Sequence, residues 1–221
     1  MLISKYKTTS CINGCKLFND DSNYEYWEDK KVTTDEIEIV KYLNTYSHDK
    51  KFSILHIGIG NSYVAKYLKC YKKIDGITVS QNEIKKGLLL NINNYQIYFM
   101  NKFEKNIFLK SKLNHYDIII DVNLKSFSCC EESFFDLINN YCKILNHNGI
   151  LITSKKGMKW SRIIKPVYAF SIKKLLYKKL KEFNGPTSNI LTMNDCKDLC
   201  SKYKMKINFE NQHLVNFIKN E

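Results

Sequence analysis

Two glycines, Gly58 and Gly60, follow a run of apolar residues and stand in the stretch His56-Ile57-Gly58-Ile59-Gly60-Asn61-Ser62. Glycine has no Cβ, so a polar group of a ligand can approach the backbone closely at such a turn. A helix that begins near Ser62 would also present free N–H groups, which favour an electron-rich ligand. In α/β proteins, a turn of this kind is where a nucleotide-like ligand binds. Gly58, Gly60, Asn61 and Ser62 are therefore the first candidates for a binding site.

Asp121 and His56 are the candidates for acid–base chemistry. Asp121 ends a run of three isoleucines, and ligands of α/β proteins bind outside the carboxyl ends of strands. Its carboxylate could accept a proton from a reacting oxygen or nitrogen. His56 is the second candidate, because an imidazole titrates near neutral pH. A histidine inside a strand is more often a core residue, so a structural role for His56 stands beside the catalytic one.

The elements that must position these residues follow from hydrophobic periodicity. Short β-branched runs alternate with helical patterns, and a helix is expected to begin near Thr33, which has capping-box spacing to Glu36. The predicted strands are 52–57, 74–79, 96–100, 116–122, 150–153, 204–209 and 213–218. The predicted helices between them are 62–70, 81–90, 131–145 and 194–202. This order predicts a three-layer Rossmann-like α/β sandwich with a mostly parallel seven-stranded sheet and an antiparallel C-terminal hairpin strand.

A chain of 221 residues suits a single domain. We expect a helical cap in residues 1–50, a ligand-binding core in 51–154, a basic helical insertion in 155–190, and a C-terminal helix and hairpin in 191–221. No apolar run reaches the roughly 20 residues that span a bilayer, and no export signal is visible, so the expected location is the cytoplasm. The eight cysteines are then thiols, and their spacing does not predict a metal site.

Three stretches resemble the class I S-adenosylmethionine-dependent methyltransferases: 56–62, Gly-Ile-Thr-Val-Ser at 76–80, and the helix–turn–strand at 143–152. The likeness covers residues 50–154 and implies a methyltransferase with S-adenosylmethionine as its cofactor. It implies that the turn at Gly58 faces the methionine part of the cofactor and that the end of the second strand meets the ribose. A nicotinamide-dependent dehydrogenase is a weaker alternative, because the turn lacks the full Gly-x-Gly-x-x-Gly pattern.

The chain departs from the family pattern at three positions. His56 stands where the family usually has an acid, Ser62 where it has a third glycine, and Thr78 where it has a ribose-binding Asp or Glu. The form around Thr78 resembles the branch that contains the cyclopropane fatty acid synthases, in which a polar residue five positions later helps to hold the ribose. Here that residue is Glu83, so the resemblance implies a ribose contact by Glu83 with Thr78. An ordinary acid at a helix N-terminus is the alternative for Glu83.

Asn101 follows the third strand, where the family often places an Asp for the adenine amine. The resemblance implies that the Asn101 amide binds the adenine. A turn-forming asparagine is the alternative.

Residues 155–181 hold ten of the 35 basic residues and no acid, which leaves 25 basic against 22 acidic residues elsewhere. A field of one sign attracts anions, so this segment is expected to shape the acceptor site. Lys155, Trp160 and Arg162, the only arginine, are the candidate substrate contacts, since a guanidinium can grip a carboxylate or phosphate with two bonds. The expected acceptor is a small anionic metabolite or a glycan or lipid precursor. The alternatives are an RNA acceptor, contact with an anionic membrane surface, and a module that has lost turnover.

Overall fold

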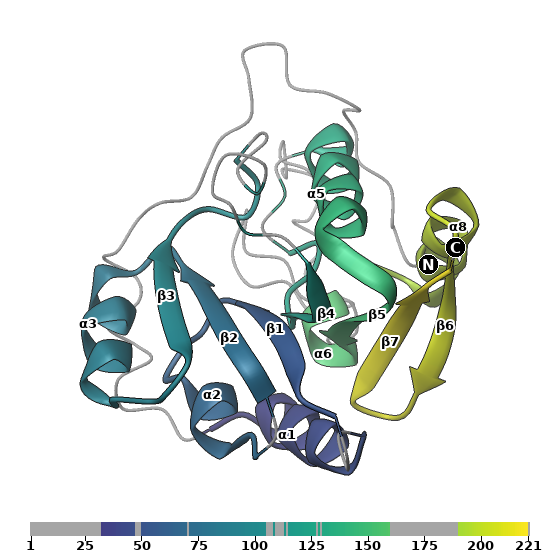
Figure 1. Cartoon of the computed structure of the whole chain (residues 1–221). Helices are drawn as coiled ribbons and strands as arrows, with labels where there is room; N and C mark the ends of the chain where they lie inside the picture. Colours follow the sequence, from purple (N-terminus) through teal and green to yellow (C-terminus); the bar gives the residue numbers. More distant parts are fainter. Residues whose placement is uncertain are drawn as a thin grey trace, which may run out of the picture.

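The computed structural model describes residues 32–46, 50–69, 71–104, 108, 113, 115–126, 128, 130–159 and 190–220. Within these residues, seven strands form one sheet in the order β3-β2-β1-β4-β5-β7-β6 (Figure 1). The strands are β1 (Phe52–Ile57), β2 (Tyr71–Thr78), β3 (Tyr95–Phe99), β4 (Tyr116–Asp121), β5 (Leu145–Ser154), β6 (Met205–Glu210) and β7 (Leu214–Lys219). Strands β1 to β5 pair in parallel and β7 runs antiparallel to both neighbours, which confirms the predicted fold class.

Helices cover both faces of this sheet. They are α1 (Thr34–Tyr46), α2 (Tyr63–Tyr67), α3 (Gln81–Leu89), α5 (Glu131–Ile144), α6 (Lys155–Met158) and α8 (Met193–Lys202). Helices α1 and α2 pack on one face against alternate strand residues such as Ile54 and Ile118. Helices α5 and α8 pack on the other face against the intervening residues, such as Leu55 and Ile119. Because side chains alternate along a strand, both faces of these central strands are apolar.

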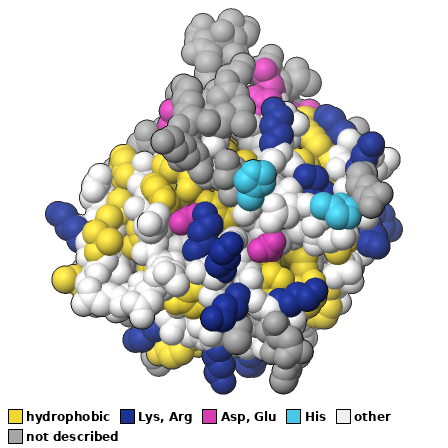
Figure 2. Space-filling model, in the orientation of Figure 1, with side chains coloured by type: hydrophobic (Ala, Val, Ile, Leu, Met, Phe, Trp, Pro, Cys, Tyr) yellow, Lys and Arg dark blue, Asp and Glu magenta, His cyan; other side chains and the backbone are white. Residues whose placement is uncertain are grey.

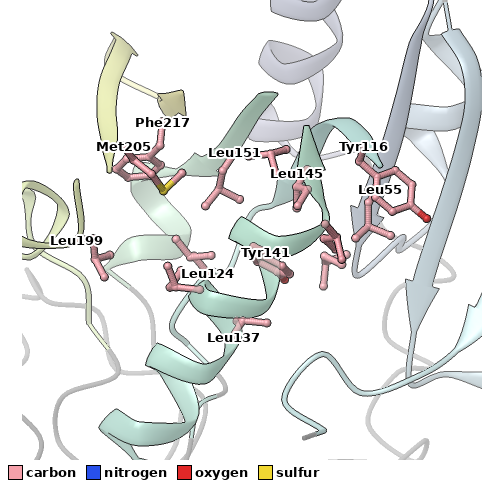
Figure 3. Packing of buried hydrophobic residues seen from close by; sticks show 14 of the residues in the cluster. Leu55, Tyr116, Leu124, Leu137, Tyr141, Leu145, Leu151, Leu199, Met205 and Phe217 are labelled. Atoms are coloured by element: carbon pink, nitrogen blue, oxygen red, sulfur yellow. The ribbon is translucent and has the colours of Figure 1, made fainter. Parts of the chain in front are cut away.

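The α5 face carries the larger of the two described cores. Figure 3 shows Leu137 and Tyr141 of α5 among side chains of the sheet, including Leu55 of β1 and Leu151 of β5. All four of these side chains are at most 2% exposed. Burying one such side chain contributes roughly 1.5–3 kcal/mol relative to leaving it in water. This core fixes the position of β1 and β4, whose carboxyl ends carry the candidate site.

The start of α1 confirms the predicted capping box. The Thr33 Oγ1 accepts a hydrogen bond from the Glu36 amide at 3.2 Å, and Glu36 Oε2 accepts one from the Thr33 amide at 2.8 Å. The pair satisfies two backbone donors that a helix N-terminus leaves without partners. The carboxylate of Glu36 is thereby held in one orientation.

Two elements differ from the sequence-based expectation. Helix α2 spans only five residues and ends at Tyr67, because Leu68 is extended, so the helix predicted over 62–70 is too long. The turn expected within the helix–turn–strand at 143–152 lies inside β5, which begins at Leu145. There, Tyr116 pairs with Leu145 and Ile118 with Ile150, so the extra residues of β5 form a bulge. The positive φ of 58° at Asn148 accommodates the bulge.

Among the described residues, we find no helix with the length and apolar character needed to cross a membrane. On the face shown in Figure 2, lysines are spread over the described surface with acidic side chains between them. The residues that would form most of the basic segment, 160–181, lie outside the described residues.

Candidate functional site

The glycine turn lies at the carboxyl end of β1, in the middle of the sheet. Gly58, Gly60 and Ser62 have positive φ angles of 72°, 52° and 59°. The conformation at Ser62 explains why a glycine suits this position, since an L-residue adopts it at a cost. Apart from Gly58 and its two neighbours in the chain, no heavy atom of the described residues lies within 4 Å of a Cβ built on Gly58. The described residues therefore leave open space on this side of the Gly58 backbone, and ligand binding there stays a prediction.

Contacts with β2 and β3 fasten the turn to the sheet. The Ser62 hydroxyl and the Tyr95 hydroxyl are 3.0 Å apart and share a hydrogen bond. Ile59, which is fully buried, occupies the space above Gly76, where an added Cβ would lie 2.6 Å from its Cγ2. On the exposed side, Asn61 Oδ1 accepts a hydrogen bond from the Tyr63 amide at 3.1 Å and leads the chain into α2. The turn is thus open towards Gly58 and tightly packed beneath Ile59.

Thr78 and Glu83 are brought together at the end of β2. The Thr78 hydroxyl donates a hydrogen bond of 2.5 Å to Glu83 Oε2 and accepts one of 3.0 Å from the Ser80 amide. Ser80 caps α3 by accepting a bond from the Glu83 amide at 3.3 Å. Thr78 and Glu83 are 4% and 8% exposed. The first turn of α3 therefore brings the Glu83 carboxylate to the end of β2, where Thr78 orients it.

Asn101 follows β3, as predicted, and is buried. Its Oδ1 accepts a hydrogen bond of 2.9 Å from the Phe103 amide, which shapes the turn after the strand. This contact is the turn-forming role that stood as the alternative. Adenine binding by Asn101 stays a prediction.

Asp121 ends β4 and is 1% exposed. Its Oδ1 and Oδ2 lie 2.8 Å and 2.7 Å from Lys102 Nζ, and Oδ2 also accepts a bond of 2.8 Å from the Tyr141 hydroxyl. Lys102 donates further bonds to the carbonyls of Asn123 and Leu124, at 2.9 Å and 3.3 Å. Burial lowers the pKa of Lys102 below its ordinary value, and Asp121 opposes this shift. The contacts favour a role in positioning the turn at 122–124 over the predicted role as a base.

Neither of the two partners of Asp121 is predictable from the sequence pattern. Lys102 stands in a polar turn among many lysines and has no spacing that marks it as buried. Tyr141 falls at a helical core position, so its apolar ring predicts its burial but not the bond made by its hydroxyl. Burial and the neighbouring Asp121 raise the pKa of Tyr141 well above its ordinary value, which keeps this hydroxyl a donor.

His56 lies inside β1 and is 1% exposed. It alternates with Leu55 and Ile57, which face α5, so it points to the α1 face, whereas Asp121 contacts Tyr141 of α5. Burial lowers the pKa of His56 to about 4, and its Nδ1 has no hydrogen-bond partner among the described residues. The two predicted bases are therefore not brought together, and the surroundings of His56 favour the structural role.

Only one of the three predicted substrate contacts falls within the described residues. Lys155 begins α6, and its Nζ lies 2.5 Å from Glu210 Oε1 on β6. Trp160 and Arg162 lie outside the described residues. The described residues contain no group of three or more metal-binding side chains.

No family model and no curated protein matches this sequence. Solved structures do match. The N-methyltransferase NodS from Bradyrhizobium japonicum WM9, in complex with S-adenosyl-L-homocysteine, has a TM-score of 0.60 at 11% identity over 92% of this chain and 100% of that chain. The magnesium protoporphyrin IX methyltransferase ChlM from Synechocystis PCC 6803, with the same ligand bound, has a TM-score of 0.56 at 12% identity, over 89% and 92% of the two chains.

The carbon methyltransferase CurJ has a TM-score of 0.59 at 12% identity over 90% of this chain and 57% of that chain. At these identities the likeness establishes the fold. The chain therefore has the Rossmann-like α/β fold of the class I methyltransferases.

Proposed function

We propose that this protein is an S-adenosylmethionine-dependent methyltransferase that acts on a small anionic acceptor. The observation that carries the proposal is the bond between Thr78 and Glu83, at the end of β2 and beside an open glycine turn. The fold supports it, because the solved structures that share it include methyltransferases with S-adenosyl-L-homocysteine bound. When bound, S-adenosylmethionine supplies an activated methyl group on its sulfonium.

The residues at the carboxyl edge of the sheet fit such a ligand. The Glu83 carboxylate can accept hydrogen bonds from both ribose hydroxyls, as an Asp or Glu at the strand end would. The Thr78 hydroxyl donates to Glu83 and accepts from the Ser80 amide, which supports a role in orienting Glu83. The backbone at Gly58 leaves room for the methionine part. The arrangement of Thr78 and Glu83 agrees with the branch of cyclopropane-synthase-like proteins, which stays a prediction.

Methyl transfer requires that donor and acceptor be held in line and away from water. We propose that Lys102 and Asp121 supply a rigid wall for this purpose, because Lys102 ties the end of β4 to the carbonyls of 123 and 124. That the basic segment 155–181 shapes the acceptor site stays a prediction from the sequence. A cytoplasmic location and contact with Lys155, Trp160 and Arg162 stay predictions.

A binding module without turnover is the second candidate function. Both carboxylate oxygens of Asp121 are engaged, and His56 is buried on the other face. Such a protein would bind the cofactor and transfer nothing.

Thermal unfolding of the full chain with and without S-adenosyl-L-homocysteine tests cofactor binding. A ligand at about 100 times its Kd raises the free energy of unfolding by about 2.7 kcal/mol, so a clear rise in Tm is expected. Incubation with methyl-labelled S-adenosylmethionine and a panel of small carboxylates and phosphates then tests turnover. Label in a small acid supports the proposed enzyme. Label only in added RNA would contradict the small acceptor, and a Tm shift without any labelling would favour the binding module.

A further inference from the structure

The carboxylate of Glu36, in the first turn of α1, faces the glycine turn. Its Oε1 lies 3.7 Å from the position of a Cβ built on Gly60. Helices α1 and α2 lie side by side in Figure 1, which places the start of α1 next to the turn that precedes α2. Glu36, which precedes Gly60 by 24 positions in the sequence, thus forms part of the wall of the turn.

The two oxygens of Glu36 are used differently. Oε2 accepts hydrogen bonds from the amide and the hydroxyl of Thr33, at 2.8 Å and 2.7 Å. Oε1, by contrast, has no hydrogen bond or ion pair with any residue in the described ranges. The residue is 9% exposed. Oε1 is not one of the fully buried polar atoms, so a hydrogen-bond donor or a cation of a ligand can reach it.

The negative charge of Glu36 at the glycine turn indicates which cation could bind there. The family pattern has an acid at position 56, but here burial keeps His56 uncharged, with its pKa lowered to about 4. Glu36 brings a negative charge to the same turn from a different element. The methionine part of the cofactor, which the turn is proposed to face, ends in an amino acid group, and its ammonium is the cation that a carboxylate can meet.

We propose that Glu36 binds the ammonium group of the methionine part of the cofactor through Oε1. The capping box orients the carboxylate before the ligand arrives, so little side-chain freedom is lost on binding. This inference rests on the proposed function, and it assigns to α1 a role in ligand selection. A carboxylate meeting an ammonium also selects against adenosyl compounds that lack the amino acid end.

The test compares two probes, S-adenosyl-L-homocysteine and 5′-methylthioadenosine, which lacks the amino acid end. Glu36→Gln is the informative variant, because glutamine can keep the capping box while the charge is removed. Calorimetric titration of the full chain is expected to show about tenfold weaker binding of S-adenosyl-L-homocysteine by Glu36→Gln. Binding of 5′-methylthioadenosine is expected to stay within about twofold of wild type.

Glu38→Gln serves as the matched control, since Glu38 is on the same helix but pairs with Lys41 on the surface. It is expected to bind both probes as the wild type does. Equal binding of S-adenosyl-L-homocysteine by wild type and Glu36→Gln would overturn the inference while leaving the proposed function intact. A wild type that binds neither probe would instead refute the proposed function. If Glu36→Gln does not fold, the wild type and the des-amino analogue of S-adenosyl-L-homocysteine decide: about tenfold weaker binding of the analogue supports the inference, and equal binding overturns it.

Discussion

The Nζ of Lys102 lies 2.8 Å from Oδ1 and 2.7 Å from Oδ2 of Asp121, and both side chains are at most 8% exposed. A buried ion pair of this kind adds little net stability, but the loss of one partner leaves an uncompensated charge. The pair also joins the end of β4 to the turn after β3. It therefore fixes two neighbouring segments at the edge of the sheet where the proposed ligand binds.

Asp121→Asn is expected to lower the free energy of unfolding by about 3 kcal/mol, because it strands the Lys102 ammonium in the core. Chemical denaturation of the wild type and the variant measures the change. The double variant Asp121→Asn with Lys102→Met should recover part of this loss. Lys41→Met is the control, since its partner Glu38 is at the surface and the expected loss is below about 1 kcal/mol. A loss for Asp121→Asn no larger than that of the control would contradict the account of the buried pair.

The buried His56 predicts a specific dependence of stability on pH. Its pKa is about 4 in the folded protein against the ordinary value of 6.5, so the unfolded chain binds the extra proton between these values. Stability from this residue is present above about pH 6.5 and is lost as pH falls towards about 4. Between about pH 7 and pH 5 the loss is about 2 kcal/mol. Urea unfolding at the two pH values should show this difference for the wild type and not for His56→Leu. An equal change in the free energy of unfolding between the two pH values for both proteins would contradict this prediction.

The close contact of Ile59 with Gly76 predicts that β2 tolerates no side chain at this point. Gly76→Ala places a Cβ 2.6 Å from Ile59 Cγ2 and is expected to lower the free energy of unfolding by about 1–3 kcal/mol. Alanine ordinarily stabilises a strand relative to glycine, so the sign of the effect is informative. A free energy of unfolding of Gly76→Ala equal to or higher than that of the wild type would show that Ile59 does not pack against Gly76 as described.

Much of this architecture could be predicted from the sequence. The alternation of β-branched runs and helical patterns predicted the succession of strands and helices along the chain. The central strands are recognisable because burial on both faces makes them continuous apolar runs. The spacing of Thr33 and Glu36 predicted the start of α1, although its acid then gained a second role that local spacing does not reveal. Thr78 and Glu83, which the resemblance names together, do meet, since both lie within one strand–helix connection; their contact with a ribose stays a prediction.

Contacts between distant segments could not be predicted in this way. The pairing of Lys102 with Asp121 spans 19 positions, and a lysine in a polar turn is ordinarily solvated. The opposite orientations of His56 and Asp121 follow only once the register of β1 and β4 is known. The bulge in β5 was predicted as a turn, because asparagine and glycine are typical both of turns that end a strand and of bulges within one.

The bond from Thr78 to Glu83 predicts a graded effect on ligand affinity. Thr78→Val removes the hydroxyl that orients Glu83 and is expected to weaken binding of S-adenosyl-L-homocysteine by about three- to tenfold. Thr78→Ser keeps the hydroxyl and should bind within about twofold of wild type. Equilibrium titration of the three proteins measures this order. Equal affinity of the valine and serine variants would show that the hydroxyl does not orient the carboxylate.

Calorimetric titration with S-adenosyl-L-homocysteine, comparing the wild type with Glu83→Gln, tests the central claim most directly. We predict saturable binding by the wild type, weakened by about tenfold or more when the carboxylate that receives the ribose hydroxyls is neutralised. Glu38→Gln should bind as the wild type does, since it removes a charge from the surface of α1. The absence of binding by a folded wild type, or unchanged affinity of Glu83→Gln, would contradict the claim that the edge of β2 and α3 holds an adenosyl cofactor.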